Sequence, residues 1–225
     1  RSSADVGAKE IAYITLVQGL AKSKLNVRLG WQTRCKPIQL PSGRILLPLY
    51  SDTFSACINA ISDDDGRTWF ASQPMIGFGN IQATLLRRND GSIVSYMREN
   101  GPLRKIRTCE STDDGMSWGP VTEAPLPNPG AGIDGVRLGD GRWALIYNDQ
   151  VQGRNQLAVS ISDDEGKSWK WTRHLEKQPK GSFHYPAIIQ GKDGTIHAVY
   201  SYFVDEGKSM KHAAFNEAWV QQGDQ

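Results

Sequence analysis

The chain has 225 residues, 39% of them hydrophobic and 22% charged, and its formal net charge at pH 7 is +2. This composition is typical of a globular protein with a sizeable core. The small charge gives no support for a nucleic-acid partner or an anionic membrane surface. No apolar run approaches the roughly 18 residues that a membrane span requires. The three cysteines show no metal-ligand spacing, and we expect them to be buried free thiols.

Residues 1–30 are predicted to form a lead-in segment that precedes the main domain. The stretch "EIAYITLVQGLAKSKL" within it is consistent with a short helix. The chain starts with Arg rather than Met and shows no signal peptide, so we expect a processed chain or a fragment.

From residue 31 onward the sequence repeats a unit of about 50 residues. The pattern Ser-X-Asp-X-Gly-X-Ser/Thr-Trp occurs at 62–69, 111–118 and 162–169, so successive copies start 49 (111−62) and 51 (162−111) residues apart. A second marker, a turn glycine before an apolar run, recurs in the same period at Gly43, Gly91, Gly141 and Gly194. Two markers with one period indicate a repeat architecture.

Each unit contains short β-branched and aromatic runs separated by Asp-Gly or Ser-Gly turns, which are hairpin signals. Four strands in about 50 residues is the size of one β-propeller blade. The sequence therefore predicts an all-β fold, with propeller blades over residues 31–225 and four blades between about 31 and 216. A helical solenoid is disfavoured, because no unit carries apolar residues at helical spacing over three turns.

The box is predicted to be a structural turn. Its aspartate (Asp64, Asp113 or Asp164) is expected to accept backbone N–H groups of its own turn, its glycine to adopt a positive φ, and its tryptophan to wedge between strands of the same blade. A calcium loop is the alternative. It would need further oxygen ligands and a glutamate near its twelfth position, and the boxes supply neither. We expect no metal and no cofactor.

The box resembles the Asp-box of the sialidase (neuraminidase) superfamily. Segments outside the boxes, among them "LPNPGAGIDGVRLGDGRWALIYND" and "SFHYPAIIQGKDGTIHAVYSY", are similar to the C-terminal part of BNR-repeat, sialidase-like proteins. The resemblance runs from about residue 25 to the end and implies a six-bladed propeller, a glycan substrate and a secreted or periplasmic location. Two N-terminal blades would then be absent here. We accordingly expect the isolated chain to be inactive, and either to form a homodimer or to leave a gap in the ring.

The repeat also locates the rim of the propeller where chemistry is expected. Counting back from each turn glycine reaches the start of the first, inner strand of the unit. Counting forward seven residues reaches the end of the second strand, which pairs with the inner strand in a hairpin. Both positions lie at the same end of an antiparallel hairpin. The polar residues gathered there are Lys36, Gln82, Arg98, Asp134, Asn148 and Tyr185. A purely structural propeller would tolerate this set, because rim ends are solvated.

The resemblance implies specific roles for several residues. Tyr185 matches the segment of the tyrosine nucleophile, and Arg98 and Arg154 match two arginines of the substrate-carboxylate triad. An arginine fork binds a carboxylate bidentately, and tyrosine replaces a carboxylate nucleophile that the substrate's own charge would repel. Arg34 is a further candidate cation, with a structural surface role as the alternative.

One position departs from the family pattern. Gln82 lies 16 residues before Arg98 (98−82), where sialidases carry the glutamate that activates the tyrosine. An amide is not a general base, and Asp134 on the next inner strand is a candidate substitute. Three functions remain open: a sialidase-like hydrolase acting on acidic glycans, a propeller of this fold that cleaves another sugar, and a carbohydrate-binding propeller without catalysis.

Overall fold

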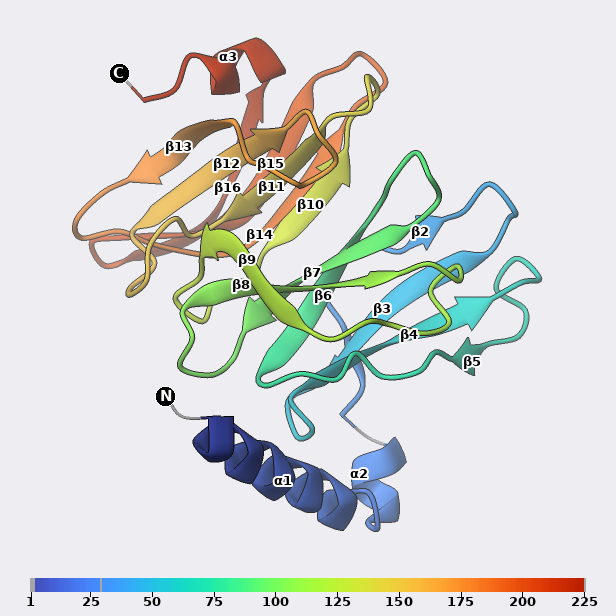
Figure 1. Cartoon of the computed structure of the whole chain (residues 1–225). Helices are drawn as coiled ribbons and strands as arrows, with labels where there is room; N and C mark the ends of the chain where they lie inside the picture. Colours follow the sequence, from blue (N-terminus) through green and yellow to red (C-terminus); the bar gives the residue numbers. More distant parts are fainter. Residues whose placement is uncertain (1–2, 29, 225) are drawn as a thin grey trace.

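The computed structural model describes residues 3–28 and 30–224, so Arg1, Ser2, Leu29 and Gln225 of the predicted segments lie outside the described residues. Four antiparallel sheets follow one another along the chain and are arranged as a β-propeller (Figure 1). Sheet A contains β1 (Gln32–Thr33), β2 (Ile38–Gln39), β3 (Ile45–Ser51), β4 (Ala56–Ser62) and β5 (Phe70–Ala71). Sheet B contains β6 (Asn80–Arg87), β7 (Ile93–Glu99), β8 (Lys105–Ser111) and β9 (Thr122–Pro127).

Sheet C contains β10 (Asp134–Arg137), β11 (Trp143–Tyr147), β12 (Gln156–Ser162) and β13 (Trp171–Lys177). Sheet D contains β14 (Ser182–Gln190), β15 (Ile196–Val204) and β16 (Gly207–Phe215). Sheets B, C and D pair their strands in chain order, as the predicted hairpins require. The all-β propeller fold and its four successive units are therefore confirmed.

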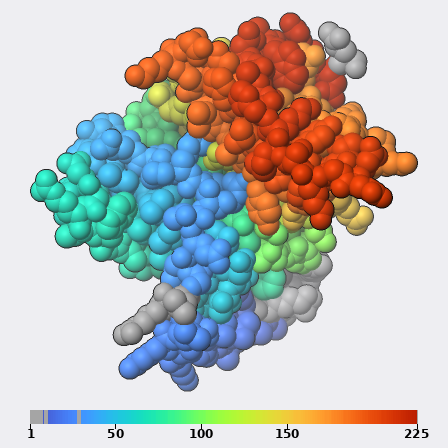
Figure 2. All heavy atoms as spheres, turned by 180° about the vertical axis from the view of Figure 1, so that it is seen from behind, coloured from blue at the N-terminus to red at the C-terminus, as the bar shows by residue number. Residues whose placement is uncertain are grey.

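Sheets A and D differ from the regular four-stranded unit. The inner strand of sheet A is split into β1 and β2, and Pro37 lies in the gap, where its missing N–H interrupts the ladder. Sheet D has three strands, and its last two meet at a tight turn in which Asp205 has φ 53°. Figure 2 shows the blue segment around β1 beside the orange and red strands of sheet D.

Each interface between successive sheets has its own hydrophobic core. Leu85 of β6 packs between sheets A and B, whereas its neighbour Leu86 packs against Trp143 between sheets B and C. Ile146 and Phe183 belong to the third core, between sheets C and D. Adjacent residues of one strand point to opposite faces, so each central sheet buries both faces and reads as a nearly continuous apolar run.

The three boxes form closely similar turns. Asp64 Oδ1 accepts the backbone N–H of Thr68 at 2.8 Å, and Asp113 and Asp164 make the equivalent bonds at 2.9 and 2.8 Å. The box glycines have φ values of 81°, 79° and 85°. These contacts confirm the structural turn.

The box tryptophans do not lie where the sequence predicted. Trp169 packs against Tyr96 of the preceding sheet, with ring centroids 5.7 Å apart, and Trp118 borders the core between sheets A and B. Trp69 is 45% exposed, because no sheet precedes sheet A in the described part of the chain. The prediction of a wedge within one blade was wrong: the box turns the indole toward the neighbouring blade, where more apolar surface is available to bury.

The lead-in segment is helical, as predicted: α1 spans Ser3–Leu20 and α2 spans Lys24–Arg28. Tyr13 anchors α1 by donating to the carbonyl of Phe54 and by packing against Phe78. A third helix, α3 (Glu217–Gln221), follows β16. Within residues 3–28 and 30–224, no helix is long and apolar enough to cross a membrane. The three cysteines are free and buried, as expected.

Candidate active site

Two β-bulges mark the predicted rim, and they occupy the same place in the repeat. The register of β6 against β7 shifts between Ile81 and Thr84, and that of β14 against β15 shifts between His184 and Ala187. Gln82 sits in the first bulge with φ 57°, and Tyr185 in the second with φ 49°. Such left-handed conformations are strained for residues other than glycine and cluster at functional sites.

Tyr185 is the most accessible of the candidate residues, with 48% of its surface exposed. Two arginines flank its ring: the guanidinium carbons of Arg34 and Arg154 lie 5.7 and 5.8 Å from the ring centroid. A Cβ at Gly132 would lie 2.8 Å from Arg34 Nε and 3.1 Å from Tyr185 Cδ1. Gly132 therefore lets the loop before β10 approach both side chains closely.

Arg154, just before β12, is held by two contacts. Its Nη1 donates to His184 Nδ1 at 2.6 Å, and its Nη2 donates to the carbonyl of Gly130 at 2.9 Å. Because Nδ1 accepts, the ring proton lies on Nε2, which donates to Ser182 Oγ at 2.7 Å. Burial, and then the charge of Arg154, lower the pKa of His184 below its ordinary value of 6.5, which keeps the imidazole neutral at pH 7.

Arg34 connects three sheets. From the segment between β1 and β2, its Nη1 donates to the carbonyl of Ile133 at 2.8 Å and its Nη2 to the carbonyl of Pro186 at 2.7 Å. These two bonds hold the guanidinium beside Tyr185. Sequence reasoning had left a structural role open for Arg34, and the contacts give it both that role and a place on the rim.

Arg98 and Gln82 meet on sheet B. Arg98 pairs with Ile81 across the hairpin, as the count from the turn glycine predicted, and His184 pairs with Ser201 in the same way on sheet D. Arg98 Nη1 donates to Gln82 Oε1 at 3.4 Å, and Gln82 is only 5% exposed. The position of the expected base is thus occupied by a buried amide that contacts an arginine.

Asp134 lies at the rim end of β10 and is 2% exposed. Its carboxylate accepts Lys36 Nζ at 2.8 Å, Thr84 Oγ1 at 3.0 Å, and the backbone N–H groups of Ile188 and Gly135 at 3.0 and 2.9 Å. These donors come from all four sheets. The contacts make Asp134 and Lys36 a clamp that joins the inner strands, and they leave little of the carboxylate free to take a proton from Tyr185.

Asn148 is fully buried beneath the rim. Its Nδ2 donates to the carbonyls of Gln156 and Phe183 at 2.9 and 3.2 Å, with a longer bond of 3.4 Å to that of Arg154. This placement supports the segment that carries Arg154 and does not favour direct contact with a substrate.

Three further residues contribute to the rim: Ser182, His184 and Gly132. The sequence signal for His184 is its place next to Tyr185. Arg154 and His184 lie 30 residues apart, so their contact depends on how sheets C and D pack. The Pro/Gly-rich stretch before β10 lies at the rim, where the carbonyl of Gly130 accepts a hydrogen bond from Arg154.

A BNR repeat-like domain model matches residues 23–198 of the chain. The chain belongs to the BNR repeat-like, sialidase-related propeller family. A sialidase of Micromonospora viridifaciens is 29% identical over 212 residues, which cover 85% of this chain and 32% of the relative. The chain therefore spans about a third of the length of that relative.

Solved structures agree with the family assignment at the level of the fold. The leech intramolecular trans-sialidase, in complex with 2,7-anhydro-Neu5Ac, has a TM-score of 0.70 at 20% identity, covering 83% of this chain and 32% of that one. A protein of unknown function from Dyadobacter fermentans has a TM-score of 0.69 at 20% identity, covering 82% and 53%. At these identities the likeness concerns the fold.

Proposed function

We propose that the rim around Tyr185 is the acidic-sugar-binding part of a glycosidase site of the exo-α-sialidase type. The observation that carries this proposal is the exposed Tyr185 at a strained bulge, flanked by Arg34 and Arg154. Arginine forks suit a sugar carboxylate, and a phenol can approach the anomeric carbon without the repulsion that a carboxylate nucleophile would meet. Arg98 supplies a further cation beside Gln82.

In this proposal Tyr185 Oη forms a bond to the anomeric carbon as the glycosidic C–O bond breaks, and the aglycone leaves as an alcohol that carries the proton given up by the phenol. Water then hydrolyses the tyrosyl–sugar bond and restores the phenol. Arg98 and Arg154 hold the substrate carboxylate. The phenol must lose a proton to become a good nucleophile, because its ordinary pKa is about 10. Neither Gln82, an amide, nor Asp134, occupied by four donors, is suited to take that proton. Neither side chain is therefore proposed as the activating base.

The buried Gln82 favours a second candidate function, a carbohydrate-binding propeller without catalysis. Calorimetry with 3′-sialyllactose, combined with mass spectrometry of the products, separates the two. The proposal predicts saturable binding that Arg154→Ala weakens about tenfold or more, since a charge-assisted contact contributes roughly 1.5–3 kcal/mol. Absence of any sialoside binding would overturn the acidic-sugar assignment.

Because this chain alone is expected to be inactive, turnover is tested with a fluorogenic α-sialoside on a six-bladed protein that contains it, as wild-type protein and as the Tyr185→Phe and Gln82→Glu variants. Tyr185→Phe should reduce any release of sugar to the background rate while it preserves binding. Gln82→Glu keeps the shape of the side chain and adds a carboxylate, and it should raise the rate. Binding without product in all three proteins supports the non-catalytic alternative. Uronate- and rhamnose-containing oligosaccharides test whether another sugar is the substrate.

A further inference from the structure

The inner strands share a matching position at the end opposite to Tyr185, four residues before each turn glycine. The residues there are Gln39, Arg87, Arg137 and Gln190. Two of these side chains reach the turn of the preceding sheet: Gln190 Oε1 accepts the N–H of Gly139 at 2.7 Å, and Arg137 Nη2 donates to Asn89 Oδ1 at 2.8 Å. The ordinary role of the position is therefore to tie neighbouring hairpins together.

Arg87 departs from this role. Its Nε is buried and has no hydrogen-bond partner, and none of the ion pairs among residues 3–28 and 30–224 includes it. A buried N–H without a partner carries a desolvation cost, which a ligand oxygen would remove. The neighbouring Arg88 differs, because it forms a two-pronged ion pair with Glu110.

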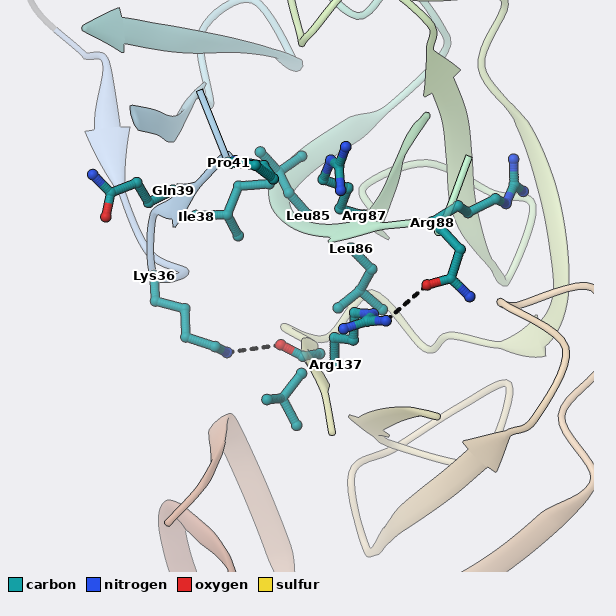
Figure 3. Close-up of a pocket in the computed structure, with 12 residues that line it drawn as sticks. Lys36, Ile38, Gln39, Pro41, Leu85, Leu86, Arg87, Arg88 and Arg137 are labelled. Carbon is teal, nitrogen blue, oxygen red and sulfur yellow. Dashed lines mark hydrogen bonds between the residues drawn. The ribbon is translucent and has the colours of Figure 1, made fainter. Parts of the chain in front are cut away.

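Arg87 and Arg137 line the same cavity, of about 450 Å³, between the inner strands of sheets A, B and C (Figure 3). Its lining includes Lys36 and three arginines but no acidic residue. Lys36 is paired with Asp134 and Arg88 with Glu110, whereas Arg87 and Arg137 have no carboxylate partner in the described chain. The wall thus carries two uncompensated positive charges.

The two arginines of this cavity lie away from the rim, and of the rim residues only Lys36 lines the cavity. Arg87 lies five residues beyond Gln82 on β6, which corresponds to about 16 Å along a strand. Apolar side chains, among them Ile38 and Leu86, complete the wall. A volume of this size is in the range of small-molecule sites, and the apolar part of the wall would hold the fixed polar groups in place.

We propose that this cavity binds a small oxyanion that carries a phosphate or sulfate group, held between Arg87 and Arg137. A guanidinium offers five N–H donors in a planar fork. Arg137 uses one nitrogen for Asn89, and the Arg87 Nε–H is without a partner. A tetrahedral oxyanion presents three or more acceptor oxygens and satisfies two forks better than a single carboxylate does.

The test is calorimetric titration of the full chain with inorganic phosphate, inorganic sulfate and succinate. Wild-type protein should bind phosphate or sulfate saturably and more tightly than succinate. Comparison of the affinities for phosphate and sulfate shows which of the two groups the cavity prefers. The R87Q/R137Q double variant should lose affinity by about tenfold or more. Glutamine is the matched replacement, because Gln39 and Gln190 occupy the same position in the first and last hairpins.

The control is R67Q, which removes one charge from an exposed residue of the first box, outside the cavity lining. It should bind phosphate as wild-type protein does. If the double variant fails to fold, R87Q alone decides, because it breaks no ion pair. Unchanged affinity in R87Q/R137Q, an equal loss in R67Q, tighter binding of succinate, or no saturable binding to wild-type protein would each overturn the proposal.

Discussion

The two bulges at the rim occupy the same place in the repeat but present opposite surfaces. Gln82 and Tyr185 share a left-handed backbone and a register shift, yet Gln82 is 5% exposed and Tyr185 is 48% exposed. Gln82 turns toward Arg98, whereas Tyr185 stands between Arg34 and Arg154. The same bulged backbone conformation is therefore associated with a buried amide at Gln82 on sheet B and an exposed phenol at Tyr185 on sheet D.

The bulge sets the orientation of the side chain, and the packing of the neighbouring sheets determines whether that side chain is buried or exposed. Sheet B is covered on both faces, by sheets A and C. At Tyr185 the neighbours are long arginine side chains and the close-packed Gly132, which leave the ring open. A side chain at a strained backbone position can thus contact a ligand only where the neighbouring residues leave it exposed to solvent.

The largest expected effect comes from breaking the clamp between the two bulged strands. Asp134 accepts the hydroxyl of Thr84 on β6 and the N–H of Ile188 on β14, so Asp134→Ala removes the tie and leaves Lys36 without its carboxylate partner. We expect a loss of about 3 kcal/mol in the free energy of unfolding, measured by urea denaturation.

The matched control for Asp134→Ala is Asp63→Ala, which removes a carboxylate from an exposed ion pair with Arg44. Exposed pairs contribute little, so the urea midpoint of this variant should stay close to that of wild-type protein. Equal destabilisation by the two substitutions would refute the clamp.

A smaller effect tests the strain in the two bulges directly. Glycine adopts a positive φ without steric cost, so Tyr185→Gly relieves strain at an exposed position and should raise the free energy of unfolding by about 0.5 kcal/mol. Gln82→Gly relieves the same strain but removes a buried side chain and its contact with Arg98. It should lower stability by about 1 kcal/mol. Chemical denaturation of both variants would show opposite signs, and a common sign would contradict the proposed difference between the bulges.

The smallest effect is a pH dependence that only the Tyr185 side should show. The pKa of His184 is lowered in the folded protein, so the stability linked to neutral His184 is fully present above 6.5 and is lost as the pH falls through the lowered value. Protonated Nδ1 cannot accept Arg154. We expect the urea midpoint of wild-type protein to fall more between pH 7.5 and pH 5 than that of His184→Gln, and equal slopes would exclude His184 as the responsible group.

The sequence predicted those features that depend on local spacing. The turn glycines fix the ends of the hairpins, so the sequence predicted that Arg98 lies opposite the start of β6. The box turns were predictable because their hydrogen bonds join residues four apart in the chain. The bulges could not be predicted from the sequence, because Gln and Tyr rarely adopt a positive φ, whereas glycine or asparagine would have indicated one. The burial of Asp134 and Asn148 was also missed, since it comes from sheets more than 30 residues away along the chain.

The buried thiols make this chain well suited to site-specific labelling. Burial raises the pKa of Cys35 to about 11 and that of Cys109 to about 12, and it raises the pKa of Cys57 as well. Thiolate is the reactive form, so all three are nearly inert to maleimides at neutral pH. A single cysteine introduced at exposed Ser42, in the turn before β3, or at exposed Gln152, in the loop between β11 and β12, would carry a fluorophore near one chosen end of the sheets. Occupancy of the two ends can then be read independently in a protein that keeps its native cysteines.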